Sequence, residues 1–144
     1  VACGDTLHGH HATLARELGI DGRVTFLGHL PHDALPDVCR GAGLHVLTSH
    51  HDAGPIAVLE AALCGVPTVG THVGHVDDFA TMASPAAAAV EGREPRALAD
   101  AIVALVHDRA RRDALANAAR RWAAQHDAAF TAVAFDQLYR RVAR

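Results

Sequence analysis

Residues 49–74 limit the fold of this chain more than any other stretch. They read SHHDAGPIAVLEAALCGVPTVGTHVG and follow an apolar run at residues 44–47, which predicts a strand. The polar residues 48–54 predict a loop, residues 55–65 a helix, and residues 67–69 the start of the next strand. A strand, loop, helix and strand in this order predict a βαβ unit of a parallel sheet, whose strand-to-helix loop is a common place for a small ligand.

Three signals predict the helix. Pro55 suits a first helical turn, because the N–H that proline lacks would have no partner there. Ile56, Leu59 and Leu63 recur at helical spacing and predict one apolar stripe that faces the core. Gly65, with a proline two residues later, is a stop signal. We therefore expect one short helix between the two strands.

Two carboxylates lie within this unit. At about 100° per residue, Glu60 falls between Ile56 and Leu63, on the stripe predicted to be buried. A carboxylate there needs a partner, either an arginine in an ion pair or the hydroxyl groups of a ligand. Asp52 precedes the helix and is either its N-cap or a ligand contact. The residues alone leave both alternatives open.

The same residues resemble a motif of the family 4 (group 1) glycosyltransferases, which have the two-domain B-type fold. In that family a Pro-Ser pair ends a strand, a Glu-Gly-Phe-Gly loop follows, and a helix ends Leu-Glu-Ala-Met-Ala-x-Gly-x-Pro-Val-Val. The matching segments here are Thr48-Ser49, Asp52-Ala53-Gly54-Pro55 and residues 59–69, followed by Val73-Gly74-His75 in place of Val-Gly-Gly. Asp52 and Glu60 are eight residues apart, as are the two glutamates of the family.

The resemblance implies roles for these residues. Glu60 would hold the ribose hydroxyls of a nucleotide sugar, and Asp52, the candidate catalytic residue, would contact the hydroxyls of the transferred sugar. The implied donor-binding set is Ser49, Asp52, Ala53, Gly54, Ile56, Glu60 and Gly74, together with Gly28, His29 and Leu30 after an expected strand at residues 23–28. The sequence departs from the family twice, because Asp52 is one methylene shorter than glutamate and Pro55 replaces a glycine with a usable N–H.

The rest of the chain alternates between the two kinds of element. Helices are expected at residues 10–18 and 34–40 and throughout the chain from residue 95, strands at the end of residues 1–5 and at 86–90, and a loop at 71–78. This order predicts an α/β fold, a three-layer Rossmann-like sandwich with a parallel sheet and C-terminal helices. The resemblance further implies that residues 1–144 are an N-terminally truncated, C-terminal donor-binding domain whose N-terminal acceptor domain is missing.

Composition narrows the class of protein. The 144 residues suffice for one domain, half of them are hydrophobic, and the net charge of −3 predicts no attraction to nucleic acid. No apolar stretch of about 18 residues predicts a transmembrane segment, although peripheral membrane association of a full-length protein is compatible with the sequence. The three cysteines form no CxxC pair, which favours the reducing cytoplasm.

The twelve histidines raise a metal-binding alternative. They cluster at His8, His10 and His11, at His50 and His51, and at His72 and His75, and none of these spacings matches a common zinc motif. We expect no metal cofactor. Two other functions stay open, a non-catalytic module that binds a nucleotide or nucleotide sugar and a His-rich metal-binding protein. The leading hypothesis is the donor-binding part of a retaining glycosyltransferase.

Overall fold

The computed structural model describes residues 9–92 and 94–143. The chain divides into two compact units, Val1–Asp37 and Val38–Arg144, which are treated separately below. The described part of the first unit contains α1 (His10–Glu17) and the short 3-10 helices η2 (Asp21–Arg23) and η3 (His32–Ala34), and α2 (Leu35–Arg40) spans the boundary. The strand expected within residues 1–5 lies outside the described residues.

The strand expected at residues 23–28 is wrong in its extent. The turn signal at Asp21 continues into η2, where the N–H of Arg23 donates to the Ile20 carbonyl at 2.8 Å and the N–H of Val24 to the Asp21 carbonyl at 3.3 Å. The chain is therefore still coiled where the strand was expected to begin. Within residues 21–30 only Phe26 makes a strand-like bridge.

The second unit is built on a parallel sheet of β1 (His45–Leu47), β2 (Thr68–Thr71) and β3 (Ala87–Val90), in the order β1-β2-β3. The strands expected at residues 44–47, 67–69 and 86–90 are thereby confirmed. Gly70 pairs with Leu47, and a Cβ atom at Gly70 would lie 2.5 Å from the Leu47 carbonyl oxygen. The two strands can approach each other in this way because position 70 has no side chain.

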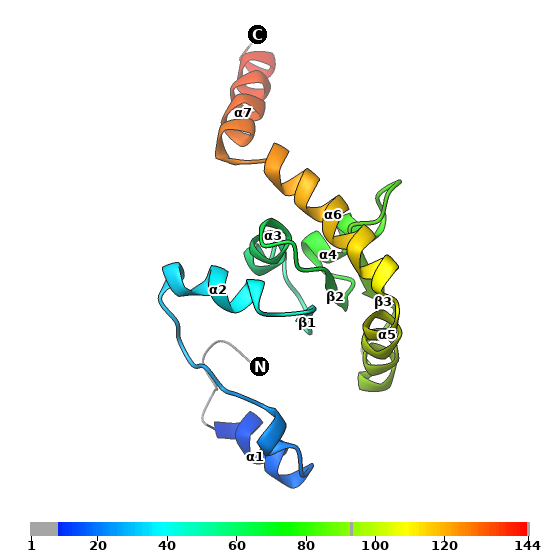
Figure 1. Ribbon diagram of the computed structural model, residues 1–144. Coiled ribbons are helices and arrows are strands. Elements are labelled where there is room, and N and C mark those ends of the chain that lie inside the picture. The colour runs from blue at the N-terminus through cyan, green and yellow to red at the C-terminus, as the bar shows by residue number, and fades with distance from the viewer. Residues whose placement is uncertain (1–8, 93, 144) are drawn as a thin grey trace. The chain divides into compact units, whose positions relative to one another are not determined.

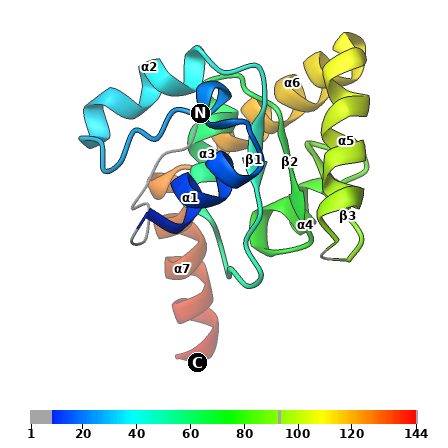
Figure 2. The ribbon, with the colours of Figure 1, turned by 90° about the horizontal axis from the view of Figure 1, so that it is seen from below.

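Helices cover both faces of this sheet (Figure 1). On one face α3 (Ile56–Leu63), α4 (Gly74–Ala80) and α6 (Arg109–Gln125) enclose a core around Val58, Phe79 and Ala87. On the other face α5 (Pro95–His107) places Leu105 against Val69 and Ala88. Figure 2 shows α5 nearer the viewer than α6. Since successive residues of β3 belong to opposite cores, the unit is the three-layer α/β sandwich that was predicted.

The buried face of α3 differs from the predicted stripe. Ile56 and Leu63 are 67% and 52% exposed, whereas Val58, Ala61 and Ala62 are buried. The helix is apolar on nearly every side, so its sequence does not mark which side faces the core. The small residues on the opposite side allow close packing against α6 and the sheet.

Two later segments also differ from expectation. Residues 74–78, expected within a loop at 71–78, belong to α4, because Val76 and Phe79 are spaced for one helical face and are buried. The last helix, α7 (Ala128–Val142), forms as predicted, but its apolar residues Phe130 and Val142 are exposed and none of its residues is buried. No helix among the described residues is long and apolar enough to span a membrane.

Candidate functional site

The candidate site lies at one edge of the sheet. Because β1, β2 and β3 are parallel, their carboxyl ends meet at the same edge. Residues 48–55 follow β1, residues 72 and 73 follow β2, and Glu91 follows β3. The strand-to-helix segments that the sequence singled out are therefore neighbours in the second unit.

Asp52 closes a turn inside the first of these loops. Its Oδ1 accepts a hydrogen bond from the Gly54 N–H at 3.2 Å, across a part-buried contact. The N-cap of α3 is Pro55, which has extended ψ of 108°, and no side chain caps the helix. The N-cap alternative for Asp52 is therefore wrong, and Pro55 precedes the first turn instead of lying in it. A ligand that uses either Asp52 Oδ1 or the Gly54 N–H has to replace the bond between them.

Gly74 brings this loop against the start of α4. It has φ of +44°, and a Cβ atom there would lie 2.7 Å from Pro55 Cδ and 2.9 Å from the Asp52 carbonyl oxygen. The loop also rests on the end of β2, where Thr71 Oγ1 donates to the Ser49 carbonyl at 2.6 Å. The structure thus brings Ser49, the Asp52–Pro55 segment and Gly74 together.

Glu60 lies one turn into α3 and is half-buried. It shares a side of the helix with the exposed residues Ile56 and Leu63 and is turned away from the buried Val58 and Ala61. The expectation that Glu60 faces the core is therefore wrong. The contact predicted for Ile56 is made by its backbone N–H, and Ile56 is the first residue of α3.

The three remaining candidates belong to the first unit. Gly28 adopts φ of +63°, which glycine tolerates better than other residues, and it is half-buried together with Leu30, while His29 is exposed. The role of these three residues in binding a donor stays a prediction.

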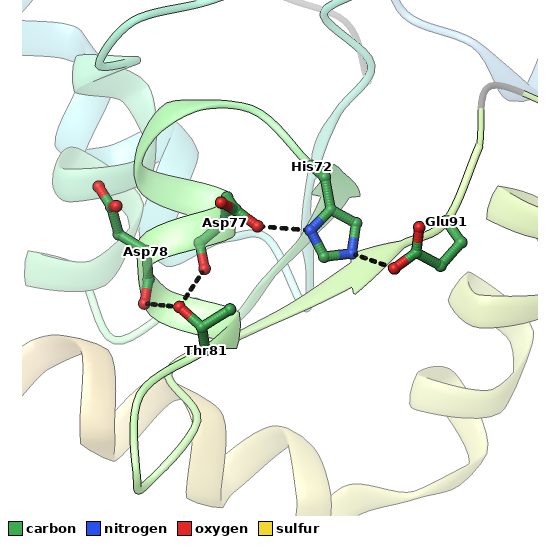
Figure 3. Close-up of polar contacts among 5 residues, drawn as sticks. All are labelled: His72, Asp77, Asp78, Thr81 and Glu91. Atoms are coloured by element: carbon green, nitrogen blue, oxygen red, sulfur yellow. Dashed lines mark hydrogen bonds and ion pairs between the residues drawn. The ribbon is translucent and has the colours of Figure 1, made fainter.

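His72 links the ends of β2 and β3 (Figure 3). Its Nδ1 lies 2.6 Å from Asp77 Oδ1 in α4, and its Nε2 lies 3.3 Å from Glu91 Oε1. Carboxylates only accept hydrogen bonds, so both contacts are hydrogen bonds when the imidazole carries both protons. The sequence pattern indicated His72 only as a candidate metal ligand. No group of three metal-ligating side chains is placed to hold an ion within residues 9–92 and 94–143.

His75 is a residue that the sequence did not assign to the site. A Cβ atom at Gly54 would lie 3.4 Å from His75 Nε2, so the imidazole lies close to the loop on the side where a side chain would be. On its other side, the ring centroid is 6.2 Å from that of Phe79 and 6.4 Å from that of Trp122. The signal that could have found it is its place one residue after Gly74, but its contacts depend on α4, which the sequence did not predict.

His45 is a part-buried histidine at the opposite edge of the sheet from these loops, at the start of β1. Its Nδ1 lies 3.1 Å from the hydroxyl of the buried Thr68. Burial lowers the pKa of His45 below its usual value of 6.5, because the charged imidazolium loses hydration in the interior. His45 therefore serves the fold and lies apart from the candidate site.

Comparisons with known proteins agree on one family. The sequence model described as "Glycosyl transferases group 1" matches residues 4–122. D-inositol 3-phosphate glycosyltransferase of Corynebacterium urealyticum is 33% identical over 127 residues, covering 88% of this chain and 30% of that protein. D-inositol 3-phosphate glycosyltransferase 1 of Catenulispora acidiphila is 38% identical over 117 residues, 81% of this chain and 27% of that protein. The chain thus spans about a third or less of the length of these relatives.

Two solved structures have a similar fold. Sucrose-phosphate synthase from Thermosynechococcus elongatus superposes with a TM-score of 0.79 at 27% identity, over 92% of this chain and 33% of that one. Anabaena Alr3699/HepE, solved in complex with UDP-glucose, superposes with a TM-score of 0.74 at 25% identity, over 85% of this chain and 35% of that one. Both superpositions cover most of this chain.

Proposed function

Because this chain belongs to the group 1 glycosyltransferase family, we propose that it is the donor-binding part of a retaining glycosyltransferase. Such an enzyme moves a sugar from a nucleotide sugar to an acceptor and keeps the anomeric configuration. The observation that supports this most directly is the Asp52–Pro55 loop, which rests on Gly74 at the carboxyl edge of the sheet, with Glu60 in the helix that follows. The HepE structure with UDP-glucose supports the nucleotide-sugar class of donor.

Each group has a proposed task. Glu60 accepts hydrogen bonds from the ribose hydroxyls, since it is half-buried on the side of α3 that the core does not use. Asp52 accepts hydrogen bonds from the transferred sugar, and its release of the Gly54 N–H provides a donor for the ligand. The first amides of α3 face the negative charge that develops on the diphosphate as the sugar–phosphate bond breaks, and the helix dipole favours charge of that sign.

The acceptor belongs, in this proposal, to a further domain. The chain covers 30% of the Corynebacterium urealyticum relative, so most of that protein has no counterpart here. We infer that residues 1–144 are the C-terminal, donor-binding domain and that the acceptor site lies on an N-terminal domain. Gly28, His29 and Leu30 are proposed to contact the nucleotide base.

A second function differs from this one only in turnover. A module that binds a nucleotide sugar without transferring it would use the same loop and the same Glu60. It is favoured by the bond between Asp52 and Gly54, which engages the candidate catalytic carboxylate within its own loop. Donor binding alone does not separate the two functions, whereas transfer by a protein that also holds the acceptor does.

Calorimetric titration with UDP-, GDP- and ADP-sugars tests the donor site. We expect one of them to bind, and we expect EDTA to leave its affinity unchanged because the proposed charge partners are amides and not a metal. Glu60→Ala removes charge-assisted hydrogen bonds of about 1.5–3 kcal/mol each, partly offset by water, so nucleotide affinity should fall at least about tenfold.

The matched control for Glu60→Ala is Glu94→Ala. Glu94 is exposed, next to α5, and has no proposed contact with the ligand. Its replacement should leave nucleotide affinity unchanged. Equal affinities for the Glu60→Ala and unmodified proteins, with intact circular dichroism, would rule out the ribose role of Glu60.

A further inference from the structure

His75 lies between the Asp52–Pro55 loop and the aromatic core. It is the second residue of α4, and its side chain is only 25% exposed. The Nε2 edge of the ring faces Gly54, where an added Cβ atom would already touch it at 3.4 Å. The imidazole therefore lies close to Gly54, the residue that forms the turn with Asp52.

The position of this ring is fixed from two other sides. Its Nδ1 lies 3.5 Å from Asp78 Oδ2, one helical turn along α4. Its face approaches Phe79, which is completely buried, and Trp122 of α6. Phe79 and Trp122 are themselves in edge contact at 5.1 Å. A ring with these contacts has little freedom to move away from the loop.

We propose that His75 is a positioning residue of the donor site, which holds the Asp52–Pro55 loop in place at Gly54 and connects that loop to Trp122. This inference rests on the proposed function, because it assigns His75 to the loop that contacts the transferred sugar. The loop is then preorganised, so that a nucleotide sugar does not have to order it on binding. A free nucleotide lacks the transferred sugar that would lie against the loop, so its binding depends less on His75.

The test compares His75→Ala with His75→Gln. His75→Ala removes the support, so the affinity for the nucleotide sugar should fall by about three- to tenfold, and the affinity for the free nucleotide by clearly less. His75→Gln fills part of the space and can donate to Asp78, so it should restore most of the affinity. The hydrogen exchange of the Gly54 amide, measured without ligand, should become faster in His75→Ala and return toward the original rate in His75→Gln.

His126→Ala is the matched control. The His126 ring stacks on Trp122 at 4.0 Å on α6, and its replacement changes the surroundings of the chain's single tryptophan without removing the support at Gly54. On adding the nucleotide sugar, the tryptophan fluorescence should change in the unmodified and His126→Ala proteins but not in His75→Ala.

Two results would overturn the inference. One is a His75→Ala protein with unchanged Gly54 exchange and unchanged affinity for the sugar nucleotide. The other is an equal loss in His75→Ala and His126→Ala, which would indicate a general loosening of the aromatic core. If the unmodified chain binds no nucleotide sugar, the proposed function fails and His75 has no donor site to position. The exchange rates then report only whether the ring supports the loop.

Discussion

At the scale of single residues, the burial of His45 is expected to make the stability of the fold depend on pH. The pKa of His45 is lowered in the folded chain, so below pH of about 6.5 the unfolded chain binds more protons than the folded one. His45 therefore contributes full stability above pH 6.5, and this contribution is lost as the pH falls below 6.5 toward the lowered pKa. The free energy of unfolding can fall in this way by at most about 1.4 kcal/mol per pH unit.

Thermal unfolding between pH 7.5 and 5.5 checks this prediction. The unfolding midpoint of the unmodified protein should fall with decreasing pH, and His45→Gln should show a smaller fall because its amide does not titrate in this range. His107→Gln, at the exposed end of α5, is the control for a histidine on the surface and should behave like the unmodified protein. Equal slopes for all three proteins would contradict the prediction.

Asp52 gives a second prediction at this scale. Asp52→Glu restores the longer reach of the family's loop, so it should preserve or improve binding of the nucleotide sugar relative to the free nucleotide. Asp52→Asn keeps an oxygen for the Gly54 N–H but loses the charge, and it should weaken sugar binding by about 1.5–3 kcal/mol, the size of a charged hydrogen bond. Calorimetry with both ligands checks the two variants, and identical affinities throughout would leave Asp52 with only its role in the turn.

The sequence predicted some residue positions and not others. It placed Asp52 in a loop and Glu60 in the helix that follows, because strand, loop and helix are local features. It did not give the surroundings of Glu60, since a helix that is apolar on nearly every side has no unique inner face. It also missed the close approach of His75 on α4 to Gly54 in the loop before α3.

At the scale of elements, α5 and α7 have similar lengths and apolar patterns but different surroundings. Leu105 of α5 is 1% exposed in the core against β2 and β3, whereas Leu138 of α7 is 43% exposed. Leu105→Ala should therefore lower the free energy of unfolding by about 2–5 kcal/mol through the lost burial and the remaining cavity. Leu138→Ala should lower it by less than about 0.5 kcal/mol, as is usual for surface positions.

Urea denaturation of the two variants measures this difference. The two substitutions are chemically identical, so helix propensity cancels between them and only the environment differs. A loss for Leu138→Ala as large as that for Leu105→Ala would mean that α7 is packed in solution. Both helices were predicted from the same kind of stripe, because periodicity identifies an apolar face and does not show what covers it.

The elements themselves were largely predictable, and the failure at residues 71–78 has a cause that is distant in sequence. The three strands of the sheet and the helices after residue 95 follow from period and turn residues alone. The expected loop at residues 71–78 is helical from Gly74, because burial of Val76 and Phe79 outweighs the turn signals of Gly74 and the two aspartates. Such burial depends on the sheet and α6, which are distant in sequence.

At the scale of the whole molecule, the proposed separation of donor and acceptor sites predicts what the chain can do alone. Transfer requires an acceptor held against the anomeric carbon, and positioning of this kind supplies about 7–11 kcal/mol of barrier lowering. The chain covers 30% and 27% of two relatives, and we propose that the acceptor site corresponds to a part of those proteins that this chain does not match. The 144-residue chain should therefore bind the donor without transferring its sugar.

The last prediction is that the 144-residue chain binds its nucleotide sugar but does not transfer the sugar to any acceptor. Radiolabelled donor, incubated with the pure chain, should give at most slow hydrolysis, since water needs no binding site of its own. The comparison is a longer protein that carries the same residues behind an N-terminal domain, which should transfer the label at ordinary rates. Glu60→Ala in that longer protein should weaken binding of the donor, because Glu60 is the residue proposed to contact the ribose. Equal transfer by the short and long proteins would place the acceptor and catalytic groups within residues 1–144. It would contradict the proposal that the acceptor site lies on another domain.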